Sequence, residues 1–193
     1  MPSRRFALAS GLLAALAFGG TASAQDDAYR GITWDSVPAE GADVSWGRAV
    51  AVFDEPIDQV TRIVHAYDQY NQFMPNFRTS RILSRRGDDA LVYMEVGVAR
   101  DTITLWGQMR ILSRESQDHS QVIEATMMRG NMNQFRARWV LTPVDQGRRT
   151  RVEFRILVAP DMPLPSSIFS AENVKAARKT VRALRERLAT DLG

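Results

Sequence analysis

The sequence predicts an α+β fold in which one curved antiparallel sheet of about seven strands wraps around a long C-terminal helix. Six runs of alternating apolar and polar residues follow one another with short connections between them. A single long segment with an apolar stripe at helical spacing closes the chain. Because the sheet and the helix each have one apolar face, they bury those faces when the helix packs into the concave side of the sheet.

Residues 1–24 have the layout of a cleaved secretory signal peptide. Arg4 and Arg5 precede the uncharged run from Phe6 to Phe18, and Ala22-Ser23-Ala24 resembles a cleavage site. The run is shorter than the roughly 20 residues that a membrane-spanning helix needs. We therefore expect a periplasmic or secreted protein whose mature chain begins at Gln25. The paired arginines leave the twin-arginine route open beside the favoured general secretory route.

Charge and cysteine content narrow the range of expected partners. The chain has 25 basic and 22 acidic residues, and removal of the signal peptide leaves a net charge of only +1. We therefore expect no nucleic acid partner. Basic residues on the last helix indicate at most a transient contact with a membrane surface. No cysteine is present, so the fold must rest on its core without disulfides.

The mature chain opens with a segment of little periodicity. Residues 25–43 include Gly31, Pro38 and Gly41, which is typical of an extended or disordered leader. Residues 44–53 form the first expected strand. A short helix follows, introduced by Asp54-Glu55-Pro56, and a second brief helical turn runs to Pro75. The helical spacing of the first helix is set by Val60, Ile63, Val64 and Tyr67.

Six strands follow, each bounded by residues typical of turns. Their short connections predict an antiparallel meander, and their alternation predicts one apolar face. Charged residues such as Arg136, Arg138 and Glu153 belong on the opposite, solvent-exposed face. The expected strands are about 78–85, 90–99, 102–113, 121–128, 134–142 and 150–159.

The last helix is expected to begin at Ser166 or Ser167. Pro160, Pro163 and Pro165 end the last strand before it. The apolar stripe of the helix recurs in steps of three or four, as it does on a helix that packs one face against a core. The stripe consists of Val174, Ala177, Val181, Leu184, Leu188 and Leu192.

Three short motifs and the order of the elements carry a resemblance to a known superfamily. The motifs are Phe53-x-x-Pro56, Asp68-x-Tyr70-x-x-Phe73-x-Pro75 and Met162-Pro163-Leu164-Pro165. Together they resemble the START-like, or SRPBCC, helix-grip superfamily, nearest to its polyketide cyclase and coenzyme Q-binding types. The resemblance covers residues 44–193, which we expect to form one START-like domain. It implies the fold and leaves the ligand open.

The resemblance implies a cavity between the sheet and the long helix that holds a hydrophobic molecule. Methionine and aromatic side chains on the inner faces agree with such a site, because methionine adapts to irregular ligands. The same side chains are also typical of an ordinary core, and that alternative stays open. The candidate pocket residues are Phe73, Met74, Met94, Leu105, Met109, Met127, Phe135, Trp139, Phe154, Ile168, Phe169, Val174 and Val181.

The sequence contains no recognisable catalytic set. His65 and His119 have no metal-ligand spacing, so we expect no metal and no cofactor. By alternation, Tyr93 and Glu95 lie opposite the apolar face, and only a shift of register would turn them inward. We therefore assign no catalytic residue.

The favoured function is that of an exported carrier or binding protein for a hydrophobic, lipid-like ligand. A cyclase or aromatase that uses the same cavity is the first alternative, and it predicts that Glu95, Thr104 or Arg136 lines the pocket. A protein-interaction module with a filled core is the second, with Trp46 or Trp106 in its contact surface.

Overall fold

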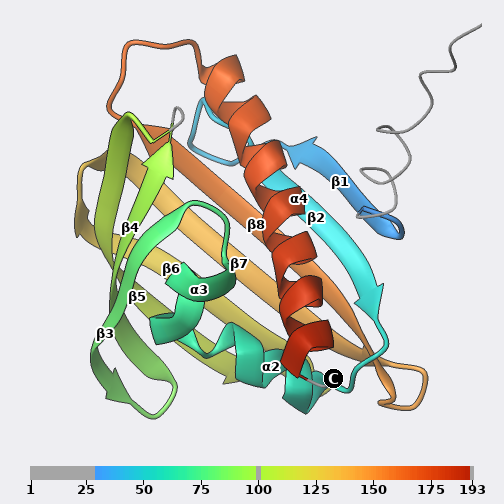
Figure 1. The fold of residues 1–193 in the computed structure, drawn as a ribbon. Coiled ribbons are helices and arrows are strands. Elements are labelled where there is room, and N and C mark those ends of the chain that lie inside the picture. Colours follow the sequence, from blue (N-terminus) through green and yellow to red (C-terminus); the bar gives the residue numbers. More distant parts are fainter. Residues whose placement is uncertain (1–28, 99–100, 192–193) are drawn as a thin grey trace, which may run out of the picture.

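The computed structural model describes residues 29–98 and 101–191, in which one sheet and one long helix dominate (Figure 1). The predicted signal peptide, residues 1–24, lies outside the described residues. The elements in chain order are β1 (Ile32–Val37), β2 (Trp46–Phe53), α2 (Ile57–Val64), the 3₁₀ turn η1 (Tyr67–Gln69), α3 (Tyr70–Phe73), β3 (Phe77–Arg86), β4 (Asp89–Val98), β5 (Ile103–Glu115), β6 (Gln121–Gly130), β7 (Met132–Val144), β8 (Arg149–Pro160) and α4 (Ser166–Asp191).

All eight strands belong to one antiparallel sheet in the order β1-β2-β8-β7-β6-β5-β4-β3. The sheet curves around α4, and α2 and α3 lie across its lower end in Figure 1. We call the face toward α4 the inner face and the opposite face the outer face. The α+β prediction is confirmed, and the six expected strands β3 to β8 agree with the observed ones to within a few residues.

The eighth strand, β1, lies in the segment for which the sequence analysis assigned no strand. It pairs with β2 along the sheet edge, from Ile32 opposite Ala51 to Val37 opposite Trp46. Four of its residues are exposed in succession, so it shows no alternation that a sequence pattern could reveal. Basic residues of α4 help to hold this edge, because the Arg178 guanidinium lies 5.0 Å from the ring centroid of Tyr29.

The short helices differ in detail from the expectation. Pro56 has an extended backbone and stands just before α2, which begins at Ile57 and ends at Val64, earlier than predicted. Asp54 does not cap the helix; its carboxylate pairs with the Arg149 guanidinium at 2.8 Å. After α2 the chain tightens into η1 and α3, and the Tyr70 hydroxyl donates a hydrogen bond to the carbonyl of Val64 at 2.6 Å.

Helix α4 packs along β1, β2 and β8. Its predicted stripe is confirmed for Ala177, Val181, Leu184 and Leu188, all of which are buried. The buried side chain of Asn173 fastens the N-terminal half of the helix to the sheet. Its amide nitrogen donates to the carbonyl of Ser45 at 3.1 Å and to that of Val158 at 3.3 Å, and its oxygen accepts from the Val158 amide at 3.1 Å.

Candidate functional site

The inner face of the sheet is apolar over long stretches of its central strands β7 and β8. Neighbouring strands place apolar side chains next to one another on this face, as with Trp139 opposite Phe154 and Ala137 opposite Ile156. Every inner position from Phe135 to Leu141 on β7, and from Val152 to Val158 on β8, is apolar. The alternation predicted from sequence therefore produces one continuous apolar surface.

The inner face is filled at one end. Leu141 and Val152 have no exposed surface there, and Trp139 stacks on Phe154 with ring centroids 4.2 Å apart. Helix α2 packs against β7 and β8, and it also contacts α4. This end is an ordinary close-packed core.

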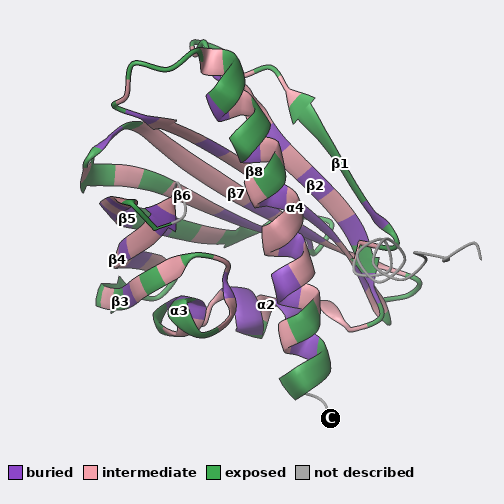
Figure 2. Cartoon of the chain, turned by 45° about the horizontal axis from the view of Figure 1, so that its top comes forward, coloured by how far each residue is buried: buried purple, intermediate pink, exposed green. Residues whose placement is uncertain are grey.

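The rest of the inner face is only partly covered, and we call its half-buried apolar side chains the inner patch. Helix α4 lies over β1, β2 and β8, and α3 packs mainly on β3, so neither helix covers the middle strands closely. Figure 2 shows long stretches of intermediate burial on β7 and β8. The inner patch consists of Val98, Ile103, Ala125, Met127, Phe135, Ala137, Ile156 and Val158.

The residues predicted from sequence fall into four groups. Of the thirteen, Met127 and Phe135 belong to the inner patch, Phe73 and Val174 are half-buried elsewhere, and Ile168 is 44% exposed at the start of α4. The other eight are buried in the core. Their contact with a ligand stays a prediction. The buried group is Met74, Met94, Leu105, Met109, Trp139, Phe154, Phe169 and Val181.

Six residues of the inner patch are not among the thirteen predicted pocket residues. Most of those thirteen are methionine or aromatic side chains, or large aliphatic ones, whereas Ala125, Ala137, Ile156 and Val158 are smaller or lack an aromatic ring. Ala137, Ile156 and Val158 do appear in the alternating pattern of β7 and β8, so the signal was present. Strand alternation does not show where α2 and α4 lie on the sheet, and their positions decide which inner residues are covered.

The three polar residues that the cyclase alternative would place in the pocket, Glu95, Thr104 and Arg136, all lie on the outer face or at its edge. The Glu95 carboxylate accepts hydrogen bonds from the hydroxyls of Tyr93 at 2.5 Å and Thr79 at 2.8 Å. The Tyr93 hydrogen bond is the main cause that lowers the pKa of Glu95. Thr104 accepts from the Arg78 guanidinium at 2.6 Å, and the Arg136 guanidinium lies 5.1 Å from the ring centroid of Trp46.

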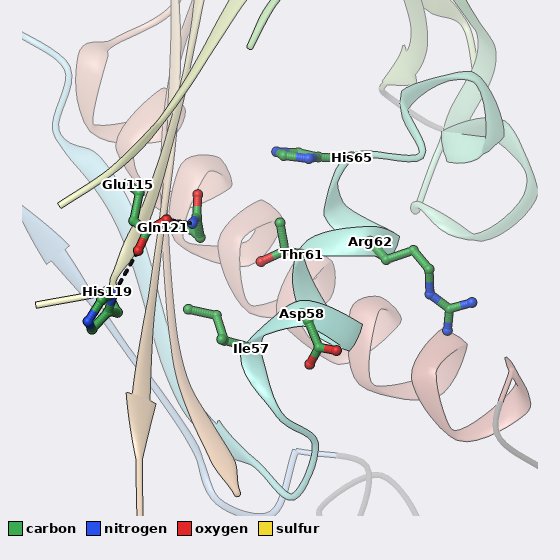
Figure 3. A pocket seen from close by; sticks show the side chains of 8 residues that line it. All are labelled: Ile57, Asp58, Thr61, Arg62, His65, Glu115, His119 and Gln121. Atoms are coloured by element: carbon green, nitrogen blue, oxygen red, sulfur yellow. Dashed lines mark hydrogen bonds and ion pairs between the residues drawn. The ribbon is translucent and has the colours of Figure 1, made fainter. Parts of the chain in front are cut away.

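A surface pocket of about 560 Å³ lies between α2 and the β5–β6 connection (Figure 3). The two histidines lie on different walls of it. His65 Nε2 is 3.0 Å from the Ser113 hydroxyl, and His119 Nδ1 is 2.8 Å from the Glu115 carboxylate. In the described parts of the chain no three His, Cys, Asp or Glu side chains gather closely enough to hold a metal ion.

A second pocket of about 490 Å³ lies beside the start of α4. Ser36, Ser45 and Ser170 line it together with Val174, so this predicted pocket residue faces the β1–β2 side of the helix. Neither surface pocket includes a residue of the inner patch. Among the described residues, no helix is long and apolar enough to cross a membrane.

Comparison with known proteins agrees with this architecture. The model of the polyketide cyclase/dehydrase and lipid transport family matches residues 54–185. No curated protein matches the chain at a significant level. A STAR-related lipid transfer protein fragment from Xanthomonas axonopodis has 18% sequence identity and a TM-score of 0.73, covering 83% of this chain and 94% of its own.

Two further structures show how widely the fold is shared. Human STARD10 has 9% identity and a TM-score of 0.69, covering 83% of this chain and 70% of its own. The Zhui aromatase/cyclase from a Streptomyces species has 16% identity and a TM-score of 0.57, covering 77% of this chain and 95% of its own. At these identities the likeness establishes the fold, and function has to be argued from the site.

Proposed function

Because the chain belongs to the polyketide cyclase/dehydrase and lipid transport family, we propose that it binds a hydrophobic small molecule or lipid against the inner patch. The observation that carries the proposal is the half-burial of eight apolar side chains on the concave side of the sheet. A ligand that covers them removes apolar surface from water, which is worth roughly 25 cal/mol per Å². Loosely covered apolar surface of this kind is typical of small-molecule sites.

The chemistry of the inner face favours an uncharged ligand portion. Inner positions of β7 and β8 between Phe135 and Leu141, and between Val152 and Val158, provide no ionisable group. A buried carboxylate or ammonium without a partner is strongly unfavourable in such surroundings. The part of the ligand that touches the patch is therefore an acyl, isoprenoid or fused-ring hydrocarbon.

The same chemistry supports a carrier over a cyclase. Acid–base catalysis needs a titratable side chain within hydrogen-bond reach of the reacting atoms. The catalytic alternative would place Glu95, Thr104 and Arg136 in the pocket. These residues instead form hydrogen bonds or a ring contact on the outer face.

We also propose export to the periplasm or beyond, on the basis of the signal-like layout of residues 1–24.

Native mass spectrometry of the purified full-length gene product, followed by solvent extraction and lipid analysis, tests the binding proposal. We expect a hydrophobic species bound at close to one per chain. A ligand-free mass, together with no binding of a fluorescent apolar probe such as N-phenylnaphthylamine, would contradict it. Amino-terminal sequencing of the exported protein tests the export proposal separately, because retention of Met1 would argue against cleavage.

A further inference from the structure

Three arginines form a row across the outer face of the sheet. Arg48 on β2 is directly opposite Arg155 on β8, and Arg155 is directly opposite Arg138 on β7. Adjacent strands lie about 4.8 Å apart, so the row spans about 10 Å. The three side chains are 32–41% exposed. We call these three residues the arginine row.

Three carboxylates pair with the row, but two of them are shared with arginines outside it, so five arginines face three carboxylates. Glu153 is shared by Arg155 at 2.6 Å and Arg151 at 2.9 Å. Glu124 is likewise shared, by Arg114 at 2.6 Å and Arg138 at 3.3 Å. Only the pair of Arg48 and Asp35 is one to one among these contacts.

Placing three arginines side by side across neighbouring strands is expected to lower the stability of the fold. Like charges directly opposite one another on neighbouring strands destabilise a sheet. Each shared carboxylate pairs with two arginines, and one carboxylate cannot occupy the donor forks of both fully. The row is therefore part of a cationic strip in which arginines outnumber carboxylates.

An aromatic contact extends the strip. Trp46 lies two residues before Arg48 on β2, and Arg136 lies two residues before Arg138 on β7, so both are on the outer face beside the row. The Arg136 guanidinium lies 5.1 Å from the centroid of the Trp46 indole ring. Arginine and tryptophan are the residue types that dominate binding energy at protein interfaces. The planar guanidinium fork also matches a carboxylate in bidentate geometry, which a lysine cannot do.

We propose that the arginine row and Trp46 bind an acidic segment of another protein through its Asp and Glu side chains. The complementary charge and the rigid placement of the guanidiniums on paired strands favour carboxylates held in a regular array. The outer face lies across the sheet from the inner patch, so a partner seated there leaves the patch accessible. Binding at the arginine row therefore does not depend on the proposed ligand.

Fluorescence anisotropy of a labelled oligoglutamate peptide, titrated with the full chain at low and physiological salt, tests this. The patch variant combines Arg48→Gln, Arg138→Gln and Arg155→Gln. The charge-matched control combines Arg62→Gln, Arg86→Gln and Arg148→Gln, three exposed arginines outside the row. We expect saturable, salt-sensitive binding that weakens at least about tenfold in the patch variant and less than about twofold in the control.

Three results would overturn the proposal. They are no saturable binding by the unmodified chain, equal losses in both triple variants, and binding to phosphatidylglycerol vesicles that depends on the row while peptide binding does not. The last result would assign the row to a membrane surface instead. Thermal unfolding checks that the variants fold. If the triple patch variant does not fold, Arg138→Gln alone is used, with an expected loss of about threefold.

Discussion

The backbone of α4 touches the sheet where Gly47 of β2 faces Asn173. A Cβ atom on Gly47 would overlap the carbonyl of Asn173 and the amide of Val174. The contact lets the helix lie close enough for the Asn173 side chain to bond Ser45 and Val158. Helix and strand are thus joined by a close backbone approach and by buried hydrogen bonds at the same place, and this fixes how much of the inner face α4 covers.

The first prediction concerns this close approach. Gly47→Ala should lower the free energy of unfolding by about 3 kcal/mol, because the added methyl group meets backbone atoms that cannot rotate away. Urea unfolding followed by circular dichroism measures the change. Val50→Ala, on the outer side of the same strand, is the control and should cost about 1 kcal/mol or less. Equal effects of the two substitutions would show that the helix does not approach Gly47 so closely.

The second prediction concerns the buried amide. Asn173→Ala should destabilise the protein by about 2–3 kcal/mol, because it leaves half-buried backbone groups of Ser45 and Val158 without partners. Ser170→Ala, one turn earlier on α4, removes the acceptor of the Ser45 amide and should cost about 1 kcal/mol. If Asn173→Ala were no more harmful than Ser170→Ala, water would have to replace the lost hydrogen bonds.

Much of the fold follows from sequence periodicity alone. Strands β3 to β8 are predictable because each alternates apolar and polar residues between turn residues, and α4 because its buried residues recur in steps of three or four. Strand β1 is not predictable in this way. Its side chains are mostly exposed, and contacts such as that between Tyr29 and Arg178, far apart in the chain, help to hold it.

For the candidate site too, the local sequence pattern predicts which face of the sheet a side chain is on, but not whether a helix covers it. Alternation assigns Phe135, Trp139 and Phe154 to one face, but it cannot say which of them the helix covers. Trp139 and Phe154 are buried in the filled end, whereas Phe135 remains half-buried. The difference arises because α2 packs against β7 and β8 at the filled end, whereas α4 lies over β1, β2 and β8 and leaves the rest of β7 only partly covered.

The third prediction tests the inner patch. Ala137→Phe adds a ring between the half-buried side chains of Ala125 and Ile156, its neighbours across the sheet. We expect the affinity for N-phenylnaphthylamine, followed by fluorescence, to fall at least about tenfold because the ring occupies the ligand's place. Val140→Phe on the outer face is the matched control and should leave the affinity within about twofold. Loss of affinity in both variants would indicate a general disturbance of the sheet.

The fourth prediction concerns pH. Burial, aided by the charge of Arg85 and opposed by that of Asp88, lowers the pKa of His65 below its ordinary value of 6.5. The unfolded chain therefore takes up this proton more readily, so stability falls as pH drops below about 6.5 toward the folded pKa. In His65→Gln this loss of stability below about pH 6.5, measured by urea unfolding at a series of pH values, should disappear. His119→Gln, at an exposed position, should retain it.

The fifth prediction concerns the carboxylate that Arg151 and Arg155 share. Burial tends to raise the pKa of Glu153, but the hydrogen bonds from the two guanidiniums outweigh it and lower the pKa overall. A lowered folded pKa means that this stabilisation is complete above the unfolded value of about 4.3 and is lost as pH falls through the folded one. At neutral pH, Glu153→Gln should reduce the free energy of unfolding by about 1–2 kcal/mol, and stability should then fall less steeply as the pH is lowered (the acid limb of the stability curve).

Glu172→Gln is the control. The exposed side chain of Glu172 pairs with Lys175, and its substitution should change the free energy of unfolding by less than about 0.5 kcal/mol. An acid limb that Glu153→Gln leaves unchanged would mean that other carboxylates cause the acid sensitivity.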